Sequence, residues 1–432
     1  MYTGEIKSSL EGKKITLRGW AHELRDLAKI KFVLLRDEEG IIQCAVKAGK
    51  AFDSFGELSQ ESVIEIIGNV KKAQVKSSEV SVKDFEIEVV ELKLLNKAEV
   101  LPIQVVEKDI DTGLAKRLDY RFIDTRKRNI SAIFKIRSSI YKNIVDFFDK
   151  ENFVIINTPK ITTIGLESGA DSFVVDYFGK KAILAQSPQF YKQMFANGGF
   201  VRVMEIGQVY RAEKSNTTRH LTEFTGVDFE MGFIKDENDI MDIIEKMFKY
   251  VITNVKEEKR EELKLLNIEL KIPKKIPRIS MVELKKMLVK KGKKLKDDDD
   301  LDAEAEKIIG EYILKEFGEE FVFVTEYPFA RRPFYHMKPE NNPKSTRSFD
   351  LLWNGVEIAT GAQREHRLNI LQKQAKEKGV KIPKIYEDIF RYGAIPHGGV
   401  GFGLDRITQR MLNLENIRES LLLTRDVDRL TP

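Results

Sequence analysis

The chain has 432 residues, of which 42% are apolar and 33% are charged, and its formal net charge is +5. This length predicts two or three domains with sizeable cores. No run of about 18 apolar residues occurs, which argues against a membrane-spanning helix, and the first residues lack the layout of a signal peptide. Cys44 is the only cysteine, which excludes an internal disulfide and favours a reducing, cytoplasmic location.

The first 100 residues are predicted to form short strands. Their apolar residues fall into five runs, at residues 14–20, 31–36, 41–46, 63–70 and 85–92. One short helix is expected near residues 51–58. Five strands in so short a segment predict a small closed β-barrel of the OB type. Such barrels bind single-stranded nucleic acid, but others bind sugars or no ligand, so the strand pattern leaves the ligand open.

The segment 101–130 is interpreted as a hinge because it carries Pro102, Gly113 and a run of charged residues. Apolar residues then recur at helical spacing over 133–148, which predicts a long helix. Residues 153–159 predict a strand that ends at a proline. Residues 255–325 are rich in lysine and glutamate, and we interpret them as a solvated helical insertion, with a direct contact to RNA as the alternative.

Two stretches carry groups that suit a nucleotide. Residues 209–224 contain Arg211 and Arg219, and residues 397–406 approach Arg406 through closely spaced glycines. Arginine forks hydrogen bonds onto phosphate oxygens, and glycine lets a backbone approach closely. Together they can hold a bent nucleoside triphosphate and stabilise charge on its α-phosphate. A glycine-rich stretch alone would more often be a helix-entry turn, so the prediction depends on the pair.

A third stretch predicts a hairpin with two acidic residues. The Asn-Gly pair at 354–355, between two apolar runs, is typical of a two-residue turn. In that register Leu352 faces Glu357, and Asp350 faces Ala359. The two carboxylates would then be diagonal neighbours, roughly 7–8 Å apart at their α-carbons. That spacing suits one Mg²⁺ that bridges nucleotide phosphates, whereas the alternative is a pair of exposed acids.

The stretches at 209–224 and 397–406 resemble motifs 2 and 3 of class II aminoacyl-tRNA synthetases, and the predicted helix and strand at 133–159 resemble motif 1. Residues 185–193 resemble the aspartate-recognition segment of aspartyl enzymes. The chain is therefore similar to the aspartyl-tRNA synthetases of the archaeal and eukaryotic type. The resemblance covers nearly the whole chain and is weakest between 255 and 330, where a contact with the tRNA acceptor stem is the less favoured reading.

This resemblance implies an α+β fold with three parts. An anticodon-binding OB-fold barrel would occupy residues 1–100, a hinge 101–130, and a class II catalytic domain 131–432. The catalytic domain would hold an antiparallel sheet flanked by helices, with the insertion at about 255–325. Motif 1 of this class builds a two-fold interface, which implies a homodimer.

The resemblance also assigns roles in the nucleotide site. The implied catalytic residues are Arg211, Glu357 and Arg406. The implied ATP-binding residues are Arg211, Glu213, Arg219, His220, Leu221, Phe224, Glu357, Gly403, Asp405 and Arg406. The implied Mg²⁺ ligands are Asp350, Glu357 and Thr360, where threonine keeps the hydroxyl of the serine that resembling enzymes usually carry. Arg211 would bridge the α-phosphate and the amino-acid carboxylate, and Phe224 would stack beneath adenine.

The amino-acid site is implied in the same way. Its residues are Glu167, Ser187, Gln189, Lys192, Arg211, Thr360 and Arg364. Lys192 and Arg364 can pair with the side-chain carboxylate of L-aspartate, the arginine through two hydrogen bonds. An asparagine amide would present donors to cations that cannot accept them, and such a mismatch can discriminate by ~10⁴–10⁵. The related asparaginyl enzymes typically lack this lysine.

The implied function is an ATP- and Mg²⁺-dependent aspartate–tRNA ligase. The α-carboxylate of aspartate would attack the α-phosphorus of ATP, and the aspartyl group would pass to the 3′ end of tRNA(Asp). His22, Arg25, Phe32 and Gln43 match anticodon-binding positions, although Phe32 could instead be a core residue. His22 stands where anticodon-strict relatives tend to carry tryptophan, and histidine is typical of relatives that also charge tRNA(Asn).

Three alternatives remain open at this stage. An asparaginyl-tRNA synthetase shares the fold, but Lys192 argues against it. An asparagine synthetase derived from the same core would not need the N-terminal barrel. A non-catalytic tRNA-binding paralogue would be expected to have lost a phosphate or metal residue, yet Arg211, Asp350, Glu357 and Arg406 are all present.

Overall fold

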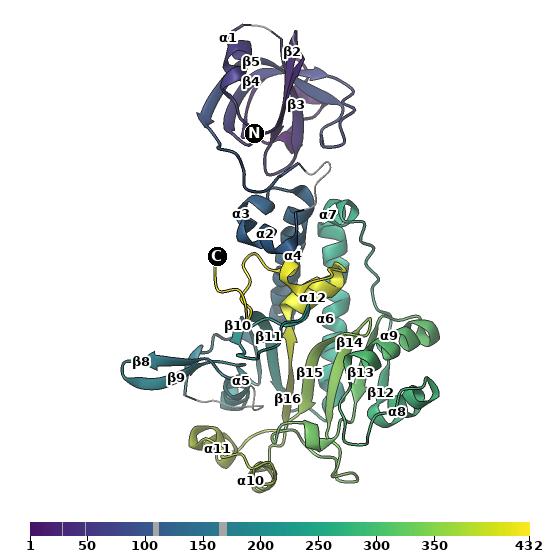
Figure 1. Cartoon of the computed structure of the whole chain (residues 1–432). Coiled ribbons are helices and arrows are strands. Elements are labelled where there is room, and N and C mark those ends of the chain that lie inside the picture. The colour runs from purple at the N-terminus through teal and green to yellow at the C-terminus, as the bar shows by residue number, and fades with distance from the viewer. Residues whose placement is uncertain (28, 48, 107–111, 164–170) are drawn as a thin grey trace. The chain divides into compact units, whose positions relative to one another are not determined.

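The computed structural model describes residues 1–27, 29–47, 49–106, 112–163 and 171–432 (Figure 1). The chain divides into two compact units, residues 1–127 and 128–432. None of the described helices is both long enough and apolar enough to cross a membrane.

The first unit is built on a closed five-stranded barrel. Its strands are β1 (Lys14–Leu27), β2 (Ile30–Arg36), β3 (Ile41–Val46), β4 (Val63–Lys72) and β5 (Phe85–Asn96). They close in the order β1-β2-β3-β5-β4, and only β3 and β5 run parallel. Alternate residues such as Val33, Leu35 and Ile42 fill the interior, as barrel geometry requires. The predicted barrel is confirmed, and the short helix expected after β3 is α1 (Lys50–Ser54).

Two short helices follow the barrel in the same unit, α2 (Leu114–Asp119) and α3 (Arg121–Asp124). Asp124 is fully buried, and it forms ion pairs with Arg121 and Lys127 at 2.7 Å and 3.2 Å. Buried carboxylates need such partners, because an unpaired charge would be strongly destabilising. These ion pairs tie the segment after α3 to its helices.

The second unit is centred on an eight-stranded sheet, visible in Figure 1. Its order is β12 (Arg278–Ser280), β13 (Phe321–Thr325), β14 (Ser348–Trp353), β15 (Glu357–Gln363), β16 (His397–Gly403), β11 (Glu223–Gly232), β10 (Arg202–Tyr210) and β6 (Val154–Ile155). Neighbouring strands are antiparallel except for the two edge pairs, β12 with β13 and β10 with β6. The expected antiparallel sheet is therefore present, with one parallel strand added at each edge.

Long helices pack against this sheet. They are α4 (Arg128–Lys150) and α6 (Glu237–Glu258), with α7 (Arg260–Leu265) and α12 (Leu404–Met411) beside them. Ile136, Ile140 and Ile144 of α4 are buried at helical spacing in the main core, which confirms the predicted long helix. The strand predicted at 153–159 is much shorter. Only Val154 and Ile155 pair, with the start of β10, and β6 is an edge strand with a single neighbour.

A smaller three-stranded sheet lies beside the main one in the same unit. It consists of β7 (Ile161–Thr162), β9 (Lys180–Leu184) and β8 (Val174–Tyr177), and α5 (Gln189–Phe195) follows it. Two further helices, α10 (Leu368–Glu377) and α11 (Lys384–Arg391), pack around the buried ring of Tyr386.

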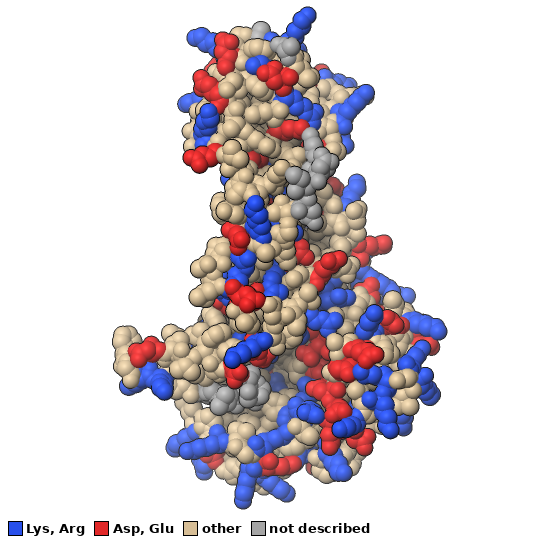
Figure 2. Space-filling model, viewed as in Figure 1, with Lys and Arg blue, Asp and Glu red and all other residues tan. Residues whose placement is uncertain are grey.

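The segment 255–325, which we interpreted as a solvated helical insertion, contains strands as well as helices. Two of its elements, β12 and β13, are strands of the main sheet, because the apolar run 321–324 pairs with β14. Its helices α8 (Met281–Lys290) and α9 (Ala303–Phe317) bury Leu288 and Ile309 against that edge of the sheet. The outer face of these helices is strongly charged, with basic and acidic residues interspersed (Figure 2).

Candidate active site

A pocket with a volume of about 370 Å³ lies in the second unit, over strands β10, β11, β15 and β16. Its lining includes most residues that the sequence analysis assigned to nucleotide and amino acid: Ser187, Gln189, Arg211, Glu213, Arg219, His220, Leu221, Phe224, Glu357, Thr360, Arg364, Gly403, Asp405 and Arg406. Lys192 and Asp350 are buried beside it. Glu167 lies outside the described residues. Residues more than 200 positions apart in the sequence thus converge on one cavity.

The β10–β11 hairpin places Arg211 and Phe224 next to each other. The two strands pair over nine residues, and the amide of Arg211 continues the ladder by donating to the Thr222 carbonyl at 2.8 Å. The Arg211 guanidinium lies over the Phe224 ring, 5.4 Å from its centroid, a favourable cation–π geometry. An exposed guanidinium is thus held against an aromatic ring at the wall of the pocket.

Sequence analysis did not anticipate Glu306, a residue of α9. Its carboxylate pairs with Arg219 at 3.4 Å, and burial together with the nearby charge of Glu357 raises its pKa to about 7. Gly310 and Gly355 explain the position of α9, because a Cβ on either would lie within 2.7 Å of backbone atoms of the other element. This close packing brings the insertion to the pocket, and no sequence motif signals it.

The β14–β15 hairpin confirms the predicted turn. Asn354 and Gly355 both have positive φ, 47° and 69°, as a type I′ turn requires. Trp353 and Val356 exchange backbone hydrogen bonds of 2.9 Å and 3.1 Å across it. Leu352 then pairs with Glu357, as expected.

The predicted register is wrong one step further along the hairpin. Asp350 pairs with Thr360 and not with Ala359, because a β-bulge leaves Ile358 without a partner. A bulge shifts the alternation of one strand relative to its neighbour. As a result Asp350, Glu357 and Thr360 share one face, although 357 and 360 would lie on opposite faces of a regular strand.

The side chains on this face fit a divalent cation. One oxygen of Asp350 accepts from Arg332 at 2.5 Å, while its Oδ1 is buried without a hydrogen-bond partner. Burial and the charge of Asp350 raise the pKa of Glu357, and the Thr360 hydroxyl lies 3.4 Å from its carboxylate. Among the described residues no cluster of three or more His, Cys, Asp or Glu could hold a metal. The remaining ligands would therefore have to be phosphate oxygens and water.

Arg406 and Asp405 follow β16 but behave differently. Arg406 donates to the backbone carbonyl of Glu357 at 3.0 Å and lies 3.7 Å from its carboxylate. The Asp405 carboxylate, which we expected to contact ATP, forms an ion pair with Arg137 and accepts a hydrogen bond from the Thr225 amide. Asp405 therefore fixes α12 to α4 and β11.

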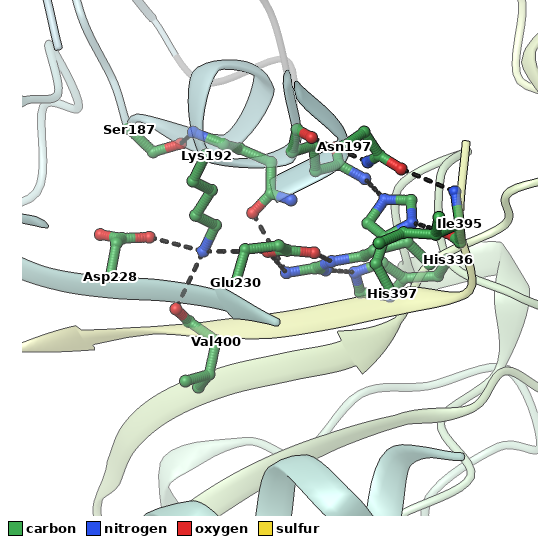
Figure 3. Close-up of polar contacts among 12 residues, drawn as sticks. Ser187, Lys192, Asn197, Asp228, Glu230, His336, Ile395, His397 and Val400 are labelled. Carbon is green, nitrogen blue, oxygen red and sulfur yellow. Dashed lines mark hydrogen bonds and ion pairs between the residues drawn. The ribbon is translucent and has the colours of Figure 1, made fainter. Parts of the chain in front are cut away.

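Lys192 belongs to a buried ion network, shown in Figure 3. Its side chain is 1% exposed, and it donates to Asp228 at 2.8 Å and to the Val400 carbonyl at 2.9 Å. Glu230 lies 3.7 Å away. A surface position for Lys192, the alternative for an isolated lysine, is excluded.

Two of the glycines before Arg406 lie against the carboxylates of this network. A Cβ on Gly399 would lie 2.2 Å from a carboxylate oxygen of Glu230, and one on Gly401 would lie 3.0 Å from Asp228. A Cβ on Gly403 would meet only ordinary contacts. Two of the three glycines, Gly399 and Gly401, thus make room for carboxylates of β11, while Gly401 and Gly403 also line the pocket.

Arg364 is the second buried cation. Its Nε and Nη2 donate to both oxygens of Glu230, at 3.0 Å and 3.3 Å, and Nη2 also donates to Gln189 at 3.2 Å. Nη1 donates to His336 at 3.1 Å. The fork expected to grip a substrate carboxylate is thus already engaged by Glu230. Among the described residues, none accepts a hydrogen bond from the second N–H of Nη1.

Sequence analysis missed the two carboxylates of this network. Asp228 and Glu230 alternate with the buried Val227 and Phe229 on β11, so two charges occur on one face of a strand that is otherwise buried. Buried charges are rarely left unpaired. This alternation of charged and buried apolar residues is the sequence signal that could have revealed the two carboxylates, and it predicts buried cationic partners for them.

In the barrel, three of the proposed anticodon residues lie on the outer face. Arg25 pairs directly with Phe32 across β1 and β2, and Gln43 pairs with Leu34. The inward residues are the neighbours of Phe32 and Gln43, such as Val33. Phe32 is half-buried and is therefore not a residue of the barrel interior.

His22 occupies a different environment. It is the extra residue of a bulge in β1 and is 3% exposed. Its ring lies 2.8 Å from Arg36, 3.4 Å from the buried Glu61 and 3.5 Å from Glu79. Burial raises the pKa of Glu61, but hydrogen bonds from His22 and Arg36, with the charges of Arg36 and Arg126, outweigh it and hold the value at about 2. His22 is thus part of a buried ionic cluster behind the half-exposed Glu79.

The barrel, the sheet and the pocket together define a class. Residues 15–90 match the family described as OB-fold nucleic acid binding domain. Residues 114–427 match the family described as tRNA synthetases class II (D, K and N). The architecture is that of a class II aminoacyl-tRNA synthetase with an N-terminal barrel.

Relatives narrow this class. The chain is 43% identical to the aspartate–tRNA(Asp) ligase of Pyrococcus abyssi, over 100% of this chain and 99% of the relative. It is also 43% identical to the aspartate–tRNA(Asp/Asn) ligase of Aeropyrum pernix, over 99% and 97%. The chain belongs to the aspartate–tRNA ligases.

Solved structures agree on the fold. The asparaginyl-tRNA synthetase of Pyrococcus horikoshii complexed with asparaginyl-adenylate gives a TM-score of 0.92 at 31% identity, covering 100% of this chain and 99% of that one. The aspartyl tRNA synthetase from Entamoeba histolytica gives 0.91 at 32% identity, covering 100% and 93%. Since both specificities share the fold, the amino acid must be argued from the site.

Proposed function

We propose that this protein activates L-aspartate with ATP and transfers the aspartyl group to the 3′ end of tRNA(Asp). The observation that carries the proposal is the pair of buried cations, Lys192 and Arg364, beside the same pocket as Arg211. A substrate carboxylate that leaves water needs cationic or hydrogen-bonding partners. The ligase names of the full-length relatives support the same substrate.

The geometry supports a division of roles within the pocket. Arg211 is exposed and stacked on Phe224, so it can meet the α-phosphate and the attacking carboxylate while adenine covers the ring. Phosphoryl transfer is accelerated mainly by positioning and by charge stabilisation. Asp350, Glu357 and Thr360 would hold Mg²⁺, which supplies positive charge to the phosphates when bound. Arg406, anchored on Glu357, and Arg219 would contact the remaining phosphates or the base.

At the amino-acid end of the pocket, hydrogen-bond donors would discriminate aspartate from asparagine. Lys192 and Arg364 only donate hydrogen bonds. Glu230, Gln189 and His336 accept four of the five N–H groups of Arg364, and no other described residue accepts the fifth. A carboxylate offers acceptors alone, whereas an amide brings its own N–H₂ against these cations. Ser187 and Gln189 line the same region.

Aspartate, and not asparagine, is therefore expected to support Mg²⁺-dependent exchange between ATP and pyrophosphate. The preference should reach at least ~10⁴-fold in kcat/KM, the lower end of the range that buried polar mismatches produce. Exchange would be measured with each of the two amino acids at saturating ATP. Comparable efficiency with asparagine would make the chain an asparaginyl enzyme, and no exchange with either would favour a non-catalytic paralogue.

We also propose the functional division of the chain. Residues 1–100 would bind the anticodon through Arg25, Phe32 and Gln43, residues 101–130 would form the hinge, and residues 131–432 would perform both chemical steps. The outer-face position of the three barrel residues supports the first part, because a stacked base needs an accessible ring. A location in the cytoplasm is proposed from the single cysteine and from the role in translation.

A homodimer is proposed from the edge of the main sheet. Val154 and Ile155 of β6 are 39% and 47% exposed, and Ile161 of the adjoining small sheet is 49% exposed. Contiguous exposed apolar residues at a strand edge are typical of an interface. The motif 1 strand carries two of these residues, which suits a two-fold contact between copies.

We also propose that the enzyme charges tRNA(Asn) as well as tRNA(Asp). The two relatives at 43% identity carry different specificities in their names, so similarity does not decide it. His22 fills a space limited by Arg36, Glu61 and Glu79. His22 would therefore affect the anticodon indirectly, through the position of Glu79. Its own ring would not limit the space for the third anticodon base as a bulky side chain would.

The wild-type enzyme should therefore charge transcripts of tRNA(Asn) and tRNA(Asp) with less than about a hundredfold difference, ~2.7 kcal/mol at 1.36 per tenfold. His22→Trp should push Glu79 outward and reduce charging of tRNA(Asn) more than charging of tRNA(Asp). Unchanged exchange between ATP and pyrophosphate is the control for the catalytic unit. A larger preference of the wild type for tRNA(Asp) would refute this reading.

A further inference from the structure

His336 is a buried residue of the pocket that no motif assigns. It lies in the segment before β14, lines the pocket and is 2% exposed. Its backbone faces Arg364 in an antiparallel bridge, and the flanking amides of Glu365 and Met337 close hydrogen bonds of 2.9 Å and 3.0 Å between the two segments. Directly opposite residues of paired segments have neighbouring side chains. His336 and Arg364 are therefore held against each other by the backbone.

The hydrogen bond between them fixes the state of the imidazole. Nη1 of Arg364 lies 3.1 Å from Nε2 of His336, and a guanidinium only donates. Nε2 must therefore carry the lone pair, which leaves the proton on Nδ1. Burial and the charges of Arg364, Arg332 and Lys192 keep the pKa of His336 well below its usual value, in agreement with a neutral ring.

The neutral ring of His336 adds a fourth hydrogen bond to those that Arg364 forms. Glu230 and Gln189 accept three of its five N–H groups, and His336 accepts a fourth. The ring of Tyr335 lies 5.4 Å from the guanidinium carbon. Without an acceptor at position 336, one Nη1 proton would be buried unpaired, which is destabilising. The guanidinium could then satisfy that proton only by turning.

We propose that His336 is a positioning residue for amino-acid selection: its Nε2 holds Nη1 of Arg364 so that the remaining N–H of Arg364 is presented to the side-chain carboxylate of the substrate. The proposal rests on the proposed activation of aspartate. It assigns His336 no contact with ATP and no proton transfer. An acidic residue at position 336 would add a negative charge beside the substrate carboxylate, and a cationic residue there would repel Arg364. A neutral acceptor does neither.

Three variants separate this role from a general effect on folding. His336→Gln places an amide oxygen near the position of Nε2 and keeps the acceptor. His336→Asn is shorter, keeps a polar group near Nδ1 and loses the acceptor. His336→Leu has a similar volume and no polar atom. Each would be measured for KM of aspartate, KM of ATP and kcat in exchange between ATP and pyrophosphate, and for thermal unfolding.

We expect His336→Leu and His336→Asn to raise KM for aspartate at least tenfold and to lower the preference for aspartate over asparagine at least tenfold. KM for ATP should stay within twofold, and His336→Gln should remain within threefold of the wild type in KM for aspartate. If His336→Leu fails to fold, the contrast between the Gln and Asn variants decides. Equal behaviour of those two, or a parallel rise in both KM values, would overturn the proposal.

The proposed function and this inference fail differently. A wild-type enzyme that does not activate aspartate would refute the function itself. A wild-type enzyme that does activate aspartate, together with a His336→Leu variant whose KM for aspartate is unchanged, would refute only the role of His336.

Discussion

Replacement of Arg211 by alanine is expected to lower the rate of aspartyl-adenylate formation at least ~100-fold, the scale of losing one donor to a developing oxyanion. The physical reason lies in how differently the cations of the pocket are used. Lys192 and Arg364 are engaged by buried carboxylates. Arg211 forms no ion pair with any residue that the structure describes and rests on the Phe224 ring. Its charge is therefore available to the phosphate.

For the Arg211 variants, adenylate formation would be measured in a single turnover, with pyrophosphate release as the signal. Arg211→Lys is the matched control, because it keeps the charge and loses the planar fork, and its rate should fall between alanine and the wild type. The exposed position of Arg211 predicts little change in thermal stability. Near-normal adenylation by the alanine variant would mean that the α-phosphate binds elsewhere.

Local signals in the sequence predicted the parts of the fold that local chemistry determines. The Asn-Gly pair at 354–355 gave the turn, because both residues tolerate positive φ. Alternating apolar residues gave the barrel strands, and the spacing over 133–148 gave α4. In each case a few neighbouring residues carry the whole signal.

Tertiary packing determined what the sequence did not show. The bulge at Ile358 moves Thr360 onto the face of Asp350, and no turn rule predicts it. Glu306 reaches Arg219 from an insertion more than 80 residues away. The motif residues were predicted by type and position. The counter-charges, which are the oppositely charged residues that pair with Lys192, Arg364 and Asp405, were found only in the structure.

These counter-charges change the view of substrate selection. The buried cluster contains two cations, Lys192 and Arg364, and two carboxylates, Asp228 and Glu230, so it is balanced before any substrate arrives. Selection of aspartate must then depend on the few N–H groups left over, and not on an open cationic hole. This makes the orientation of each buried cation as important as its presence.

Lys192→Met should accordingly change both stability and activity. Removing one partner of a buried ion pair leaves the other uncompensated, and we expect the free energy of unfolding to fall by about 3–5 kcal/mol, measured by denaturant unfolding at neutral pH. Asp228, 2.8 Å from the Lys192 ammonium, is the carboxylate left unpaired.

The double variant Lys192→Met with Asp228→Asn separates the two roles of the lysine. It removes the ammonium together with the charge of its partner, so much of the lost stability should return, since a matched apolar or neutral replacement of a buried pair is often nearly neutral. Activation of aspartate should not return, because the donor near the substrate carboxylate is still missing, and kcat/KM should stay at least ~10²-fold below the wild type, as for loss of one charged hydrogen bond. If the double variant regained activity along with stability, Lys192 would be a structural residue, and the selection of aspartate would have to rest on Arg364 alone.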